Sequence, residues 1–78
     1  MRIIDSIPHP TITISIFQMN DKYLVKLEAG PMEQVFKFSI EEVKNVDNLK
    51  KIVNDEFIEK CRARFNDMYL QLKASTTK

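Results

Sequence analysis

The feature that most restricts the fold of this 78-residue chain is the alternating segment TITISIFQM at residues 11–19. Its isoleucines, at positions 12, 14 and 16, alternate with threonine and serine. Because successive side chains of a β-strand point to opposite faces, a period of two predicts a strand with one apolar face and one polar face.

Two further segments, residues 23–28 (YLVKLE) and residues 32–40 (MEQVFKFSI), show the same alternation. Asn20-Asp21 and Ala29-Gly30-Pro31 separate the three segments. Asn, Asp and Gly tolerate the left-handed backbone that tight turns require. Two short connections in succession predict a three-stranded antiparallel meander over residues 11–40.

After Ile40 the apolar period changes from two to that of a helix. Ser39 and Glu42 have capping-box spacing, which predicts a short helical turn, and Asp47 is a second candidate cap. On a helical wheel, the stripe that follows Asp47 points about 140° away from the stripe between residues 57 and 72. We therefore expect a break near Asn54, with Asn54 capping the second helix.

These elements predict a two-layer α+β fold. Its parts are a three-stranded antiparallel meander, a short helix, and a long C-terminal helix, with the helices packed on one sheet face. The length allows a single domain, residues 1–78. We expect an extended N-terminal segment at 1–10 before the sheet at 11–40, a helical part at 41–73, and a frayed tail at 74–78.

The balanced charge and the lack of targeting signals make several classes of protein poor matches for this sequence. Twelve Lys and Arg residues against eleven Asp and Glu residues give a net charge of +1, which lacks the basic excess typical of nucleic-acid binders. The first residues have no apolar core, so we expect no signal peptide, and no apolar run is long enough to span a membrane. The lone cysteine fits a reducing compartment, so the expected location is cytoplasmic.

The sequence also lacks a recognisable catalytic constellation. His9 lies between two prolines, which favours an exposed linker histidine, and Cys61 falls on the apolar stripe of the long helix, where a thiol is buried and inert. One cysteine and one histidine cannot supply the four ligands of a structural zinc site, and one glycine cannot form a phosphate-binding loop. We expect no enzyme, no metal site and no cofactor.

The second face of the predicted sheet carries apolar residues that the helices would leave uncovered. Exposed apolar patches often mark contacts with partner proteins. Two possibilities remain open. This face contacts a partner, or it is covered by a strand bulge or by the N-terminal segment through Ile3, Ile4 and Ile7. The predicted contact residues are Phe17, Met19, Leu24 and Val35.

The favoured functional hypothesis is a small non-enzymatic interaction module that binds itself or another protein, with no membrane partner. The alternative is a weak nucleic-acid-binding accessory protein, which would use the basic residues of the last helix to contact phosphates. Nucleic acid is the less favoured partner, because the expected spacing sends Phe65 and Tyr69 of that helix into the core. The residues of this alternative anion site are Lys60, Arg62, Arg64 and Lys73.

Overall fold

The structure is a computed structural model, and it describes residues 2–76. Within these residues the chain forms four strands followed by three helices. The strands are β1 (Arg2–Ile7), β2 (Thr13–Met19), β3 (Lys22–Ala29) and β4 (Met32–Ser39), and the helices are α1 (Ile40–Val43), α2 (Val46–Ile52) and α3 (Asp55–Thr76). The predicted α+β class is confirmed, and the strands form one antiparallel sheet in the order β1-β2-β3-β4.

The predicted three-stranded sheet is wrong by one strand, because part of the expected N-terminal extension pairs with β2. Ile7 lies opposite Ile14 and Ile3 lies opposite Phe17, and the register shifts between Ile3 and Asp5. Ile4 and Ile7 pack against the core. The N-terminal segment therefore extends the sheet sideways, and it does not fold over the second face.

Both predicted hairpin turns use residues with a left-handed backbone. Asn20 has a φ of 56° between β2 and β3, and Gly30 has a φ of 60° between β3 and β4. Glycine adopts this conformation without the steric cost that a Cβ atom imposes. These turns are short, so they fix the register of the meander.

The break between the last two helices is confirmed at Asn54. Its Oδ1 accepts a hydrogen bond from the Phe57 backbone N–H at 2.9 Å, which caps the start of α3. The other two predicted caps differ. Ser39 precedes α1 without a side-chain capping bond, and Asn45, in place of Asp47, caps α2 by accepting from the Asn48 N–H at 2.8 Å.

The core lies between the helices and one face of the sheet. Leu27 and Leu49 are both 0% exposed, and they represent the sheet side and the helix side of this layer. Within residues 2–76, twelve buried residues form the cluster: Ile12, Ile14, Ile16, Tyr23, Val25, Leu27, Val43, Leu49, Val53, Ile58, Cys61 and Phe65. Among the described residues, no helix is long and apolar enough to cross a membrane.

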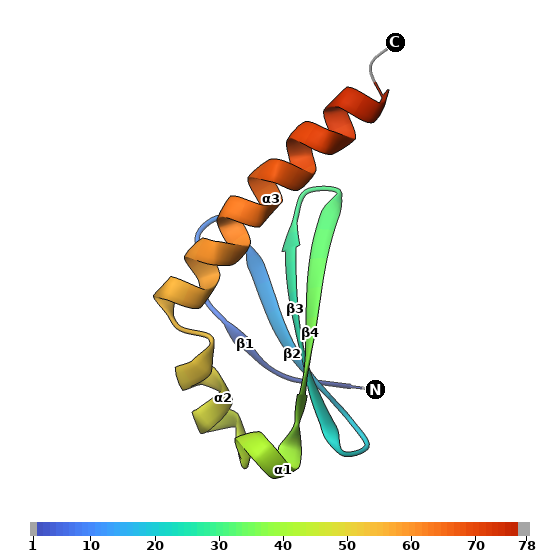
Figure 1. Cartoon of the computed structure of the whole chain (residues 1–78). Coiled ribbons are helices and arrows are strands. Elements are labelled where there is room, and N and C mark those ends of the chain that lie inside the picture. The colour runs from blue at the N-terminus through green and yellow to red at the C-terminus, as the bar shows by residue number, and fades with distance from the viewer. Residues whose placement is uncertain (1, 77–78) are drawn as a thin grey trace.

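Helix α3 is longer than the sheet that it covers. Its 22 residues span about 33 Å at 1.5 Å per residue, and its C-terminal turns reach beyond the β3–β4 turn (Figure 1). Tyr69 and Leu72, expected on the core stripe, are consequently 48% and 40% exposed. The helix also continues through Thr76, three residues past the expected end at residue 73, and residues 77–78 of the expected tail lie outside the described residues.

Candidate functional site

The sheet face opposite the helices, called the outer face below, is a grid of side chains fixed by the strand register. Residues that face each other on neighbouring strands lie in one row across the sheet. The pairing defines four successive rows: Met19, Lys22 and Ser39; then Ile3, Phe17, Leu24 and Lys37; then Ser6, Ser15, Lys26 and Val35; then Thr13, Glu28 and Glu33.

An apolar band crosses this grid. Ile3, Phe17 and Leu24 are consecutive neighbours in one row, and Val35 lies diagonally next to Leu24. Ile3 is 58% exposed and Val35 is 45% exposed, while Leu24 at 8% forms the floor between them. Covering these water-exposed apolar groups with a partner lowers the free energy of the complex relative to the separate chains.

The band contains a shallow hollow of about 220 Å³, lined by Phe17, Leu24, Lys26, Glu33 and Val35. The ammonium of Lys26 lies 3.3 Å from a carboxylate oxygen of Glu33 at its edge. The structure thus brings three of the predicted contact residues together. The fourth, Met19, is half-buried in the next row.

Charge on the outer face is separated along the strand direction. Lys22 and Lys37 lie in the first two rows, and Glu28 and Glu33 lie in the fourth. The apolar band shares the second row with Lys37, and Lys26 in the third row pairs with Glu33 of the acidic end. The face therefore has a basic end, an apolar middle and an acidic end.

Each of the four residues predicted to form an anion site on α3 has a contact within the chain. Lys60 pairs with Glu56 at 3.6 Å. The Nε and Nη2 atoms of Arg62 each donate to the carboxylate of Glu59 at 2.9 Å. The hydrogen bond from Arg62 lowers the pKa of Glu59, and the same bond raises the pKa of Arg62. Lys73 is also engaged within the chain.

Arg64, the fourth of these residues, takes part in a contact that the sequence reading missed. It donates from Nη1 to Oε1 of Gln34 at 2.9 Å, and Nε2 of Gln34 donates to the Cys61 carbonyl at 3.0 Å. Gln34 lies opposite Leu27 and is 9% exposed, so its amide connects β4 to α3 inside the core layer. The sequence alternation could have predicted this inward position, because Gln34 lies on the same face of the strand as Phe36 and Phe38.

His9 and Cys61 each contribute to the structure of the fold. Nδ1 of His9 accepts hydrogen bonds from the backbone N–H groups of Thr11 and Ile12, at 3.2 and 3.1 Å, which orders the β1–β2 connection. Cys61 is 1% exposed, and burial raises the pKa of its thiol, which disfavours the reactive thiolate. Within residues 2–76, no group of three or more His, Cys, Asp or Glu side chains is placed to hold a metal ion.

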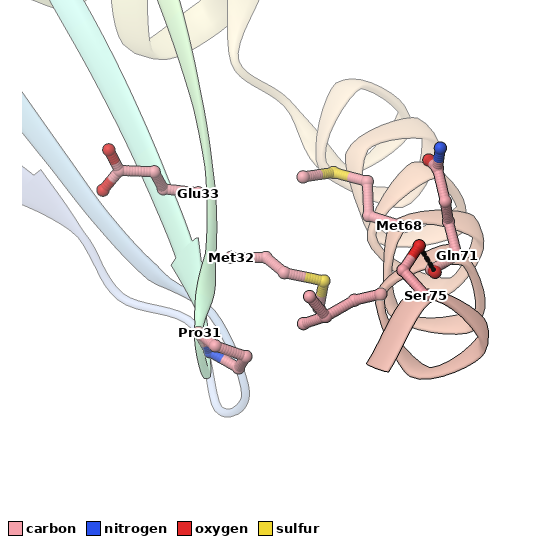
Figure 2. Close-up of a pocket in the computed structure, with 7 residues that line it drawn as sticks. Pro31, Met32, Glu33, Met68, Gln71 and Ser75 are labelled. Carbon is pink, nitrogen blue, oxygen red and sulfur yellow. Dashed lines mark hydrogen bonds between the residues drawn. The ribbon is translucent and has the colours of Figure 1, made fainter. Parts of the chain in front are cut away.

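A second hollow, of about 410 Å³, lies between the β3–β4 hairpin and the C-terminal half of α3. Met32 and Met68 extend toward each other across it, and Glu33 points away from α3 (Figure 2). It exists because α3 continues past the hairpin, so its last apolar residues have no strand beneath them. Two methionines give this hollow a deformable lining.

The protein exposes more surface than a compact protein of its size. A folded 9.2-kDa chain is expected to expose about 4,900 Å², whereas this chain exposes 5621 Å². Its radius of gyration is 13.8 Å, against about 11.5 Å expected for a domain of this length. The excess follows from the elongated shape, with extents of 47 × 24 × 19 Å, because α3 extends past the sheet.

Comparisons of the chain with family models, with curated proteins and with solved structures gave no match.

Proposed function

We propose that the protein is a small non-enzymatic interaction module whose outer face binds a second copy of the chain. The observation that carries this proposal is the apolar band of Ile3, Phe17, Leu24 and Val35 on the sheet face opposite the helices. This band spans all the strands of the described sheet and contains a hollow. The buried lone thiol of Cys61 suits a reducing compartment, and we propose a cytoplasmic location.

A second copy is the partner that the charge pattern favours. The outer face carries both signs of charge in separate ends, so it is complementary to itself when one copy is reversed relative to the other. A face of one sign would require a partner of the opposite sign.

The nucleic-acid alternative has the weaker support of the two. Its four cations on α3 are engaged within the chain, by Glu56, Glu59 and Gln34 or by the contact of Lys73. Phe65 is 4% exposed and therefore buried away from any base that could stack on it, whereas Tyr69 is 48% exposed.

The experiment that tests the proposal is light scattering on a sizing column over a range of concentrations. Wild type is expected to elute with a mass of two chains. Val35→Glu and Ile3→Glu should shift the equilibrium to the monomer, since each places a charge in the apolar band. Ile52→Glu is the matched control, because Ile52 on α2 is 41% exposed, close to the 45% of Val35, and lies off the outer face.

Circular dichroism must show that each variant keeps the wild-type fold. Leu24 is left intact, because it is 8% exposed and a charge there would also disturb folding. A monomeric wild type at all concentrations overturns the proposal. So does a dimer that Ile52→Glu dissociates and Val35→Glu leaves unchanged.

A further inference from the structure

We infer that the edge strand β4 pairs with β4 of a second copy, antiparallel and centred on Val35, so that two sheets join into one continuous sheet. This contact uses the backbone of a sheet edge, whereas the contact proposed above uses the side chains of a sheet face. The inference therefore goes beyond the proposed function and does not rest on it. Where both contacts form, the edge joins two outer-face dimers.

The outer edge of β4 carries backbone groups that have no partner in the described chain. In an antiparallel pair, opposite residues alternate between those that exchange hydrogen bonds and those that do not. At the end of the β3–β4 ladder, the Ile40 N–H donates to the Asp21 carbonyl at 3.0 Å, so the even-numbered residues of β4 face β3. The N–H and C=O groups of Glu33, Val35 and Lys37 point away from β3, and no group within residues 2–76 bonds to them.

The opposite edge of the sheet, β1, is protected against such pairing (Figure 1). Its register shifts between Ile3 and Asp5, and the Ser6 N–H donates to the Asp5 carboxylate at 2.8 Å. Irregular edges resist pairing with another strand. Strand β4 instead pairs with β3 over eight residues without a register shift and contains no proline. It is therefore the edge that can accept a further strand.

The charges of β4 favour a second copy as that strand, and they select its register. When the pairing is centred on Val35, Glu33 of each copy lies opposite Lys37 of the other, on the outer face. Opposite charges on facing residues stabilise a strand pair, and like charges destabilise it. A pairing centred on Glu33 or Lys37 sets that residue opposite its own charge. A pairing centred on Gln34 or Phe36 leaves no opposite charges facing each other.

The side chains of β4 also suit this contact. Lys37 is exposed and forms no ion pair with any of residues 2–76. The carboxylate of Glu33 pairs with Lys26 at 3.3 Å, but the Glu33 side chain is still 54% exposed. On the helix side, the same register places Met32 opposite Phe38 of the second copy, and both residues are only half-buried in the single chain. The second copy therefore covers apolar side chains that α3 leaves partly exposed.

The test is backbone amide hydrogen exchange, followed by NMR in dilute and in concentrated solution. One added strand pair is weak in water, so we expect the contact at concentrations above those that fill the outer-face dimer. The N–H groups of Glu33, Val35 and Lys37 should then exchange about fivefold more slowly, because only the unpaired edge exchanges. Those of Gln34 and Phe36 already bond to β3, so their exchange should not depend on concentration.

Charge variants test the register. Lys37→Glu opposes Glu33 of the second copy at two symmetric positions, so it should weaken the edge contact about tenfold. Mixing this variant with Glu33→Lys should restore the protection, since both charge pairs of the mixed dimer are attractive. Lys51→Glu, an equal charge change at an exposed site on α2, is the control and should leave the protection unchanged. Circular dichroism must show that each variant keeps the wild-type fold.

The outcomes separate the edge contact from the outer-face contact. Ile3→Glu, which disrupts the outer face, should keep the edge protection and form species of no more than two chains. Larger species of Ile3→Glu would indicate head-to-tail pairing of β4 with β1, and they would overturn the inference. So would edge amides that exchange at one rate at every concentration, or protection that Lys37→Glu does not reduce; both results leave the proposed function standing. Edge protection in a wild type whose mass matches that of Ile3→Glu at every concentration overturns the proposed function alone.

Discussion

The buried amide of Gln34 offers a direct test of how α3 is held on the sheet. Its Nε2 donates to the Cys61 carbonyl at 3.0 Å, and its Oε1 accepts from Arg64 at 2.9 Å. Gln34→Leu has a similar volume and removes both bonds. Hydrogen bonds contribute about 0.5–1.5 kcal/mol each, and more with a charged partner.

Two effects reduce the loss. Arg64 is exposed and regains water, and leucine adds apolar contact in the core layer. We therefore expect Gln34→Leu to lower the free energy of unfolding by about 1 kcal/mol, which corresponds to a fall in the melting temperature of about 4–8 °C. Urea titration followed by circular dichroism at the helix band measures the first quantity, and thermal melts measure the second.

A double-mutant cycle with Arg64→Ala assigns part of this effect to the Gln34–Arg64 contact. The two substitutions should be non-additive, with a coupling of about 0.5 kcal/mol or more. Gln18→Leu is the matched control, because Gln18 is exposed on β2. The reasoning is refuted if Gln34→Leu is at least as stable as wild type and additive with Arg64→Ala.

Three further predictions concern local features. Asn54→Ala should cost about 1 kcal/mol of stability in urea titration through loss of the α3 cap, whereas Asn66→Ala, at an exposed site inside α3, should be neutral or stabilising; equal effects would contradict the capping role. The Cys61 thiol should react slowly with a chromogenic disulfide reagent in the native protein and rapidly in denaturant, and fast native labelling would contradict its burial. A hydrogen bond from Lys50 holds the pKa of Asp5 below its ordinary value, so this ion pair stabilises the fold at neutral pH and the stability is lost as pH falls through the lowered pKa. Asp5→Asn should therefore lose less stability than wild type between about pH 6 and pH 3, and identical acid titrations would contradict this.

The parts of the fold that follow from local pattern were predictable. Period-two alternation located β2, β3 and β4, and their parity assigned Phe17, Leu24 and Val35 to the outer face. The change of direction between two apolar stripes located the break at Asn54, because a straight helix cannot aim both stripes at one sheet.

The parts that depend on distant contacts were not predictable in this way. Strand β1 lacks clean alternation because its register shifts between Ile3 and Asp5, so only the pairing with β2 reveals it. The exposure of Tyr69 and Leu72 depends on where the β3–β4 hairpin ends under α3, which helical spacing alone does not specify. The cap of α2 is Asn45 and not the predicted Asp47, because both side chains can cap a helix and α2 begins two residues earlier than a cap at Asp47 would place it.

The measurement that tests the central claim most directly is the concentration dependence of methyl resonances by NMR. Dilution of wild type should shift the methyl signals of Ile3, Leu24 and Val35 on the outer face and leave those of Leu70 and Leu72 on α3 unchanged. Shifts confined to Leu70 and Leu72 would place the contact at the end of α3, and signals that do not change with concentration would show that the chain does not self-associate. Either result would contradict the account.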